Sequence, residues 1–273
     1  MVSVSEAYDL ILRHPFKPSD TVVSLTEAVG RVLSEPVYAD RDFPPFNRVA
    51  MDGVAVAFEA LSNGQRKFVI ESVQAAGSPQ KKLNDPLKAL EVMTGAVLPE
   101  GTDTVIRYED TRISDGNVQI LTDSFQRGQH IHLKGQDALQ GDELLAPGIV
   151  LSPAEIALLA SAGKTKVSTR SLPKTAIIST GDELVDVQAT PAPHQIRRSN
   201  SYALFASLAQ LQCSAALYHL PDEPRAMEQK LGSLLKEHDA LILSGGVSKG
   251  KFDHVPEVLE KLHIKKVFHQ VSQ

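Results

Sequence analysis

The chain has 273 residues, is 42% hydrophobic and 22% charged, and carries 28 Lys and Arg against 33 Asp and Glu, a net charge of −5. This balance excludes the basic excess typical of nucleic-acid-binding proteins. Charged residues or prolines interrupt every apolar run before the ~18 residues that a membrane span needs. The single cysteine excludes an intrachain disulfide, and the N-terminus has no secretory leader pattern. These features predict a cytoplasmic, multidomain protein with no nucleic-acid or membrane partner.

The first predicted elements are two helices around a short strand. Ser3 and Glu6 have the spacing of a capping box at the start of an amphipathic helix. A strand over residues 21–25 and a second helix over about 26–34 follow. Pro36 ends that second helix.

The next stretch, from about residue 67 to 150, consists of short β-rich segments. Asp115-Gly116 lies between two of them and is a strong signal for a hairpin. Short strands at this spacing favour a small antiparallel β-module. A helix then begins after Ser152, with a second capping box, and ends at Gly163.

From Pro173 onward, apolar strands alternate with longer helical segments. This alternation predicts βαβ units and a parallel sheet covered on both faces. The expected strands are 174–180, 213–220, 239–246 and 264–271, and the expected helices are 199–212, 223–238 and 253–262.

The predicted fold class is therefore a multidomain α/β protein. A three-layer α/β domain with a mostly parallel sheet occupies residues 171–273. Residues 1–48 and 138–170 form a discontinuous helical or mixed domain. A β-rich module, residues 49–137, is inserted into it. The Pro-rich segments near residues 44 and 173 are natural boundaries.

Three acidic residues follow the ends of the predicted parallel strands. Glu183, Asp222 and Asp253 are thereby expected at one rim of the sheet, where α/β folds bind ligands. Oxygen ligands beside a phosphate site suit Mg²⁺. Each acid alone is better explained as a helix cap, Asp182 or Glu183 at the first position, but the set of three favours a site.

The loop that begins at Ser244 has the sequence SGGVSKGKFD. Its small residues let the backbone approach an anion, and its N–H groups and Ser248 can act as donors. It has neither the glycine pattern of dinucleotide sites nor the ending of a P-loop. A phosphate cradle and a plain tight turn are equally compatible with these residues.

Three more clusters precede the α/β part. They contain Asp52, then Thr94 and Glu109, then Asp137. Each cluster alone is explained by turn chemistry. His130 and His132 lie two residues apart without a third donor at a recognisable metal spacing, which predicts a solvated strand face.

Taken in order, these clusters resemble one family. PPFNRVAMDGVAVA, TGAVLPEGTDTVIRYED, GQD, STGDEL, HQIRRSNSYAL and SGGVSKGKFDHV follow one another as in the MoeA family, the molybdopterin molybdenumtransferases, and the gephyrin E domain is similar. The resemblance covers nearly the whole chain. It implies Mg²⁺-dependent insertion of molybdate into adenylylated molybdopterin, with release of AMP. It also implies a homodimer, with residues 1–48 and 138–170 as the linker and dimerisation domain, and molybdopterin adenylyltransferase as the upstream partner.

The resemblance also assigns roles to residues of this chain. The catalytic set that it implies is Asp52, Thr94, Glu109, Asp137, Glu183 and Asp222. The metal ligands that it implies are Asp222 and Asp253. The pterin phosphate and AMP would be held by Ser199, Asn200, Ser244, Gly245, Gly246, Val247 and Ser248, and molybdate would lie near Asp52. In the mechanism that we expect, molybdate oxygens attack the phosphorus without a protein nucleophile.

Some positions depart from the family pattern. Asn47-Arg48 replaces the usual Asp-Asn or Asp-Ser pair before AMDG, which removes one acid and adds a cation. That cation either favours an oxyanion or pairs with a carboxylate. Arg198 stands where an acid is common. The family's Lys-Pro-Gly-Lys-Pro segment and C-terminal β-domain are expected to be absent. Two hypotheses therefore remain: the enzyme, or a non-catalytic module that dimerises or binds molybdopterin.

Overall fold

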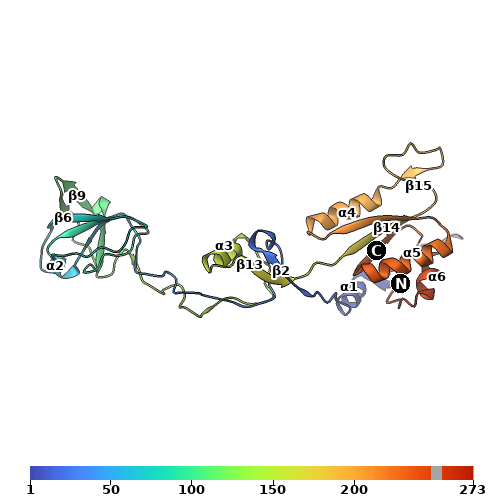
Figure 1. Cartoon of the computed structure of the whole chain (residues 1–273), viewed down its shortest axis with the longest axis horizontal. Helices are drawn as coiled ribbons and strands as arrows, with labels where there is room; N and C mark the ends of the chain where they lie inside the picture. Colours follow the sequence, from blue (N-terminus) through green and yellow to red (C-terminus); the bar gives the residue numbers. More distant parts are fainter. Residues whose placement is uncertain (247–253, 273) are drawn as a thin grey trace. The chain divides into compact units, whose positions relative to one another are not determined.

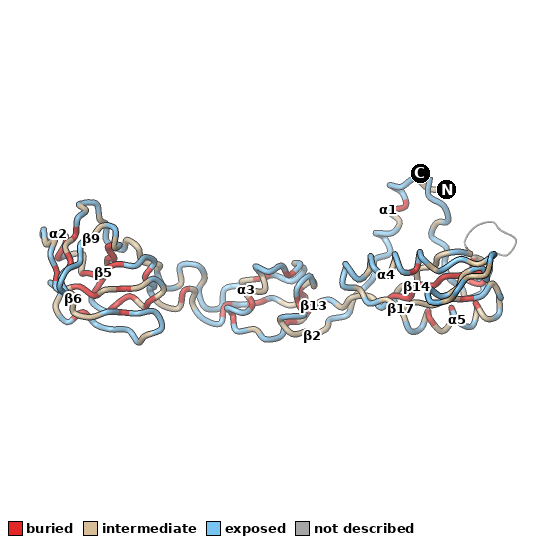
Figure 2. Tube along the Cα trace, turned by 90° about the horizontal axis from the view of Figure 1, so that it is seen from above, coloured by how far each residue is buried: buried red, intermediate tan, exposed pale blue. Residues whose placement is uncertain are grey.

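The computed structural model describes residues 1–246 and 254–272, which form two compact units. Unit 1 comprises Met1–Val23, Gly30–Ser34 and Ser168–Gln273, and unit 2 comprises Ser24–Val29 and Glu35–Val167. Figures 1 and 2 show the elements of each unit and their burial.

Unit 1 is built on a three-stranded parallel sheet with the order β17-β14-β18. The central strand β14 (Thr175–Thr180) is buried at every position, because strands flank both of its edges and helices pack against the sheet. Its neighbours are β17 (Ala215–Leu220) and β18 (Ala240–Ser244). The three carboxyl ends therefore lie at one edge of the sheet, which is the usual place for a ligand site.

Helices pack against this sheet. The core contains Ala176 and Ile178 of β14 together with Met227, Leu231 and Leu234 of α5. α4 contacts β14 and β17, and Figure 1 shows it on the other side of the sheet from α5. The helices are α4 (Asn200–Gln210), α5 (Pro224–Glu237) and α6 (Val255–Lys261).

The remaining elements of unit 1 are short. α1 (Val4–Leu12) begins with the predicted Ser3–Glu6 capping box. Two-residue strands form small parallel pairs, namely β1 (Val2–Ser3) with β19 (Val271–Ser272) and β15 (Leu184–Val185) with β16 (Ile196–Arg197).

The chain passes between the two units through a two-stranded sheet of β2 (Asp20–Ser24) and β13 (Lys166–Arg170). In unit 2, α3 (Pro153–Ser161) begins with the predicted Ser152–Glu155 capping box and contacts the 3₁₀ turn η1 (Leu25–Glu27).

Unit 2 is dominated by a six-stranded sheet with the order β8-β5-β7-β6-β10-β9. The β6–β7 pair is parallel and the other pairs are antiparallel. Asp115-Gly116 turns the β9–β10 hairpin as predicted, with positive φ at both residues. The strands are β5 (Gly53–Val56), β6 (Lys67–Gln74), β7 (Ala89–Val92), β8 (Thr104–Arg107), β9 (Thr111–Ser114) and β10 (Asn117–Ile120).

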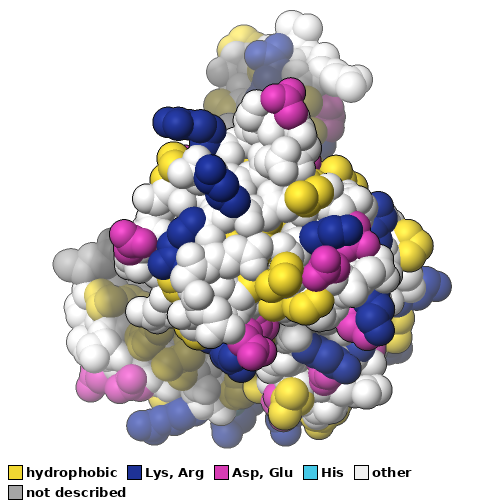
Figure 3. All heavy atoms as spheres, turned by 90° about the vertical axis from the view of Figure 1, so that its left-hand side faces the viewer, with side chains coloured by type: hydrophobic (Ala, Val, Ile, Leu, Met, Phe, Trp, Pro, Cys, Tyr) yellow, Lys and Arg dark blue, Asp and Glu magenta, His cyan; other side chains and the backbone are white. Residues whose placement is uncertain are grey.

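Both faces of this sheet are covered. Val54 and Val56 of β5 belong to one core with α2 (Phe58–Ser62), while Ala55 belongs to a second core on the opposite face. Side chains of a strand alternate between faces, so β5 contributes to both cores. The end of unit 2 that faces the viewer in Figure 3 shows Lys and Arg interspersed with Asp and Glu.

Two further strand pairs extend unit 2. β3 (Val37–Tyr38) pairs with β12 (Glu143–Leu145), and β4 (Arg48–Val49) pairs with β11 (Ile131–His132). The second pair brings the segment before Asp52 next to the segment before Asp137.

Two predicted elements are wrong. Residues 26–34 do not form a helix beyond η1, because Gly30 adopts a positive φ and Leu33 forms a β-bridge with Thr169. The strand expected over 264–271 is reduced to the two residues of β19, which pairs with β1 and not with the parallel sheet. No helix in the described ranges is long and apolar enough to cross a membrane.

The mixed α/β character expected from the sequence is confirmed. The contact pattern gives two units, and it divides the predicted discontinuous domain between them. The boundaries 1–48, 49–137, 138–170 and 171–273 therefore stay a prediction.

Candidate functional site

The candidate residues of unit 2 begin at Asp52, immediately before β5. Its Oδ1 accepts a hydrogen bond from the Thr94 backbone N–H at 2.6 Å, which brings two predicted site residues together. This bond, with a further one from the Thr94 side chain, lowers the pKa of Asp52. An exposed carboxylate held in this way remains ionised at neutral pH.

Gly53 lets β5 lie close to β8 directly after Asp52. A Cβ at residue 53 would lie 2.0 Å from the carbonyl oxygen of Ile106 and 2.8 Å from Cα of Arg107. No side chain fits there without moving the backbone of one strand. The glycine of the AMDG motif thus fixes the backbone position of Asp52 directly before the start of β5.

A hydrogen bond between Tyr108 and a second acid, Glu91, lies beside Asp52. The Tyr108 hydroxyl donates a 2.5 Å hydrogen bond to Oε1 of Glu91, and the Tyr108 N–H donates to the carbonyl of Asp52 at 3.1 Å. Burial, the bond to Glu91 and the charges of Glu91 and Asp52 raise the pKa of Tyr108. Tyr108 is therefore a neutral hydrogen-bond donor, and no spacing or motif in the sequence distinguishes it from a core tyrosine.

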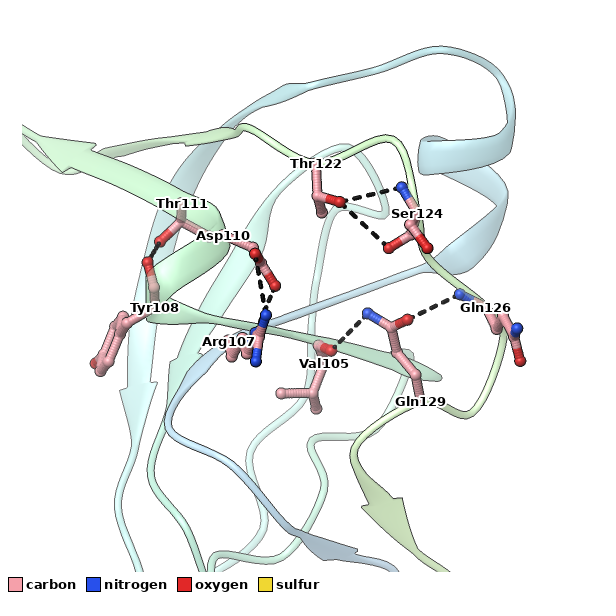
Figure 4. A network of polar contacts seen from close by, with 9 residues as sticks. All are labelled: Val105, Arg107, Tyr108, Asp110, Thr111, Thr122, Ser124, Gln126 and Gln129. Atoms are coloured by element: carbon pink, nitrogen blue, oxygen red, sulfur yellow. Dashed lines mark hydrogen bonds and ion pairs between the residues drawn. The ribbon is translucent and has the colours of Figure 1, made fainter.

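Glu109 lies on the 3₁₀ turn η2 (Tyr108–Asp110) that follows β8. Figure 4 shows what holds this turn. Arg107 Nε forms an ion pair with Asp110 at 2.6 Å across the turn, and the Thr111 hydroxyl donates to the Tyr108 carbonyl at 2.9 Å. Glu109 itself is exposed between these anchored residues, so its carboxylate is available to a ligand.

Asp137 belongs to a different group of side chains in unit 2. Its Oδ1 lies 2.9 Å from Nε2 of His132, and Nδ1 of His132 lies 3.0 Å from Nη2 of Arg48. Both histidines are partly exposed, as predicted, but only His132 lies on β11, because His130 precedes the strand with a positive φ. Arg48 also does not bind Asp137 directly.

In unit 1, three predicted binding residues line one pocket. Ser199 and Asn200 begin α4, and Ser244 ends β18; Nδ2 of Asn200 lies 3.5 Å from the Ser244 hydroxyl. The Ser199 side chain forms no capping hydrogen bond to its helix. These polar groups can therefore turn toward a ligand at the carboxyl end of the sheet.

The start of the predicted phosphate loop packs tightly against β14. A Cβ at Gly245 would lie 2.6 Å from the Thr180 carbonyl oxygen, and one at Gly246 would lie 2.7 Å from the Thr180 hydroxyl. That buried hydroxyl has no hydrogen-bond partner within the described part of the chain. Val247, Ser248 and Asp253 lie outside the described residues.

Glu183 and Asp222 lie near one another at the ends of β14 and β17. Burial, followed by the negative charge of Asp182 and a smaller contribution from Glu183, raises the pKa of Asp222; its own backbone N–H donates to Oδ1 of Asp182 at 3.2 Å. Neither acid caps a helix. Glu223 caps α5 instead, by accepting from the N–H groups of Arg225 and Ala226 at 3.1 and 2.6 Å.

Arg198 pairs with Asp186 in the loop between β15 and α4. Its Nε is buried without a partner among the residues that the structure describes. Over the same residues, no group of three or more His, Cys, Asp or Glu is arranged to hold a metal ion. The site as described is therefore rich in hydroxyl, amide and carboxylate groups and has no closed metal cage.

Comparison with known proteins matches both parts of the chain to families. Residues 2–163 match the MoeA N-terminal region (domain I and II), and residues 176–273 match a probable molybdopterin binding domain. The molybdopterin molybdenumtransferase of a Synechocystis strain is 41% identical over 275 residues, which cover 100% of this chain and 70% of that protein. That of a Staphylococcus epidermidis strain is 32% identical, with 100% and 66% covered.

Solved structures give the same result. A molybdopterin biosynthesis MoeA protein from Pyrococcus horikoshii superposes with a TM-score of 0.79 at 29% identity, covering 90% of this chain and 66% of that one. A second structure of that description has a TM-score of 0.77 at 27% identity, with 96% and 67% covered. The chain therefore belongs to the MoeA family, and its function lies in molybdenum cofactor biosynthesis.

Proposed function

We propose that this chain is a molybdopterin molybdenumtransferase, which inserts molybdate into adenylylated molybdopterin and releases AMP. The observation that carries the proposal is the 41% identity, over the whole chain, to the Synechocystis enzyme of that name. The chain spans 66 to 70% of the length of the two curated relatives described above. Each of these relatives is named as this transferase, which favours the enzyme over the non-catalytic alternative.

Unit 1 would bind the nucleotide and phosphate end of the substrate. Ser199, Asn200 and Ser244 supply hydroxyl and amide groups in one pocket, and α4 begins there. Helix N-termini and hydroxyl groups are suitable donors for phosphate oxygens. We assign Gly245, Gly246, Val247 and Ser248 to the same role, because glycine lets the backbone approach an anion closely.

The carboxylates at the ends of β14 and β17 fit the Mg²⁺ that this reaction implies. The pKa of Asp222 is raised by burial and by Asp182 and Glu183, so ionising this group of acids is costly without a cation. Mg²⁺ commonly uses one or two carboxylates, substrate phosphates and water, and needs no all-protein cage. Asp222 would hold it with Asp253. When bound, Mg²⁺ supplies positive charge that neutralises phosphate oxygens.

Unit 2 would contribute the groups that meet molybdate. The lowered pKa of Asp52 keeps this side chain a carboxylate, while Thr94 orients it and the neutral Tyr108 lies beside it. Glu109 and Asp137 add carboxylates from the turns that follow β8 and β11. No protein nucleophile is needed in this scheme: an oxygen of molybdate forms a bond to the pterin-side phosphorus, the bond from that phosphorus to the bridging oxygen breaks, and AMP leaves with the bridging oxygen.

We further propose that the chain acts as a homodimer and receives its substrate from a molybdopterin adenylyltransferase. The second point follows from chemistry: the reaction consumes an adenylylated pterin, so an adenylyl-transferring enzyme must supply it. Light scattering on the purified chain measures the mass in solution, and a monomer at all concentrations would contradict the dimer.

The decisive measurement is AMP release from adenylylated molybdopterin by the 273-residue chain with Mg²⁺, with and without molybdate. We expect release that depends on molybdate and falls by about 100-fold in Asp52→Asn, the order of loss typical for removal of a preorganised electrostatic group from an active site. Asp115→Asn removes a carboxylate from the β9–β10 turn of the same unit and should leave the rate unchanged. Tight substrate binding without release would contradict the proposal and favour a binding module.

A further inference from the structure

The backbone around Asp137 is held in place by the segment that leads to Asp52. The N–H groups of Asp137 and Gly135 donate to the carbonyls of Phe43 and Pro44 at 2.8 and 3.0 Å, and the Lys134 N–H donates to Oδ1 of Asn47 at 2.9 Å. The Asp137 side chain is nevertheless 59% exposed. Its backbone is therefore fixed, while the direction of its carboxylate depends on a side-chain partner.

His132 is that partner. It lies directly opposite Arg48 in the antiparallel β11–β4 pair, so the two side chains leave the same face of the ribbon. Nδ1 of His132 lies 3.0 Å from Arg48 Nη2, and Nε2 lies 2.9 Å from Asp137 Oδ1. The imidazole thus bridges the guanidinium and the carboxylate, and its side chain is only 25% exposed.

This arrangement selects one form of the ring. A guanidinium can only donate, so Nδ1 of His132 must accept and cannot carry a proton. The proton then lies on Nε2, which donates to Asp137. A doubly protonated ring would place Nδ1–H against the Arg48 donor. Lys134, the other cation of this loop, has its Nζ 3.3 Å from Asp42.

We propose that His132 is a positioning residue for Asp137, with Arg48 fixing its Nε2–H tautomer. The kinetic part of this inference rests on the proposed transferase function, whereas the tautomer does not. Arg48 acts here through the histidine, and among the described residues its guanidinium forms no ion pair with a carboxylate. Arg48, which departs from the family pattern, therefore has a contact partner in this chain, namely His132.

The first test is the ¹⁵N NMR spectrum of the histidine rings in the full chain at pH 7.5. We expect the His132 signals of the Nε2–H tautomer, assigned by their loss in His132→Gln. Arg48→Met should convert them to a mixture of the two tautomers. His130→Asn is the control, because Asn tolerates the positive φ at residue 130. A Nδ1–H or doubly protonated His132 in the unsubstituted protein would overturn the proposal.

The second test compares two replacements of the ring in the AMP-release assay. The Gln side chain has an oxygen that can accept from Arg48 and an N–H that can donate to Asp137, whereas Phe has neither. We expect His132→Phe to lower kcat about 10-fold, within the range for a lost hydrogen bond to a charged group, with Tm little changed. His132→Gln should recover most of the rate.

Equal losses in the Gln and Phe variants, or a Phe variant as active as the unsubstituted chain, would contradict a positioning role. If the unsubstituted chain itself releases no AMP, the proposed function fails, but the NMR spectrum still decides whether Arg48, His132 and Asp137 form the bridge. The two failures are therefore distinguishable.

Discussion

Two adjacent acids at the start of α5 have opposite roles. Asp222 is a carboxylate whose ionisation is opposed by burial and by Asp182 and Glu183, while Glu223 satisfies the free N–H groups at the helix start. The sequence favours Asp222, taken alone, as the cap of this helix, and that prediction is wrong because the chain after β17 places Glu223 at the N-cap position. The structure assigns the cap to Glu223 and leaves Asp222 free for a ligand.

The first prediction concerns Asp222→Asn in a buffer with EDTA. The folded-state pKa is raised, so the folded protein binds the proton more tightly, and stability falls as pH rises through that pKa. Asn removes this penalty, and we expect thermal unfolding of unit 1 at pH 7 to shift upward by roughly 2 °C. The difference should shrink as the pH is lowered toward 4. A downward shift at pH 7 would contradict the assignment.

The neighbouring substitution should act in the opposite direction. Glu223→Ala removes the acceptor for the N–H groups of Arg225 and Ala226. Loss of an N-cap costs about 1 kcal/mol, so the free energy of unfolding measured in urea should fall by that amount. If Glu223→Ala is neutral and Asp222→Ala is destabilising instead, the cap has been assigned to the wrong acid.

At the scale of elements, local signals predicted most of the fold. The capping boxes at Ser3 and Ser152 and the Asp115-Gly116 turn each involve residues three or fewer apart, and all three are confirmed. The helix expected over 26–34 failed because the chain turns at Gly30 and Leu33 pairs with distant Thr169. Such pairing is a tertiary effect that overrides local propensity.

A further prediction tests the close approach of β5 and β8. Gly53→Ala places a Cβ against the backbone of Ile106 and Arg107, and we expect unit 2 to lose about 3 kcal/mol of stability, at the upper end of overpacking costs. The matched control is Gly232→Ala inside α5, where the nearest atom is Leu262 Cδ2 at 3.5 Å. That change should stabilise unit 1 by about 0.5 to 1 kcal/mol. Urea unfolding followed by fluorescence and circular dichroism measures both.

At the scale of the whole molecule, the candidate site shows where sequence reasoning ends. The strand-end rule placed Glu183 and Asp222 near each other, because parallel strands share one edge. It could not find the contact of His132 with Arg48, which lie 84 residues apart in the chain. That contact depends on the register of two strands of only two residues each, which are too short for a hydrophobic pattern to specify their pairing.

The last prediction concerns the independence of the two units. Each has its own core: Ile178 and Leu231 pack in unit 1, whereas Val54 and Leu90 lie in separate cores of unit 2. A unit with its own core unfolds as one cooperative system, so calorimetry of the full chain should resolve two transitions. Gly53→Ala should lower the transition of unit 2 alone, and Asp222→Asn should raise that of unit 1 alone. A single transition that both variants shift would mean that the units stabilise one another, because coupled domains unfold together.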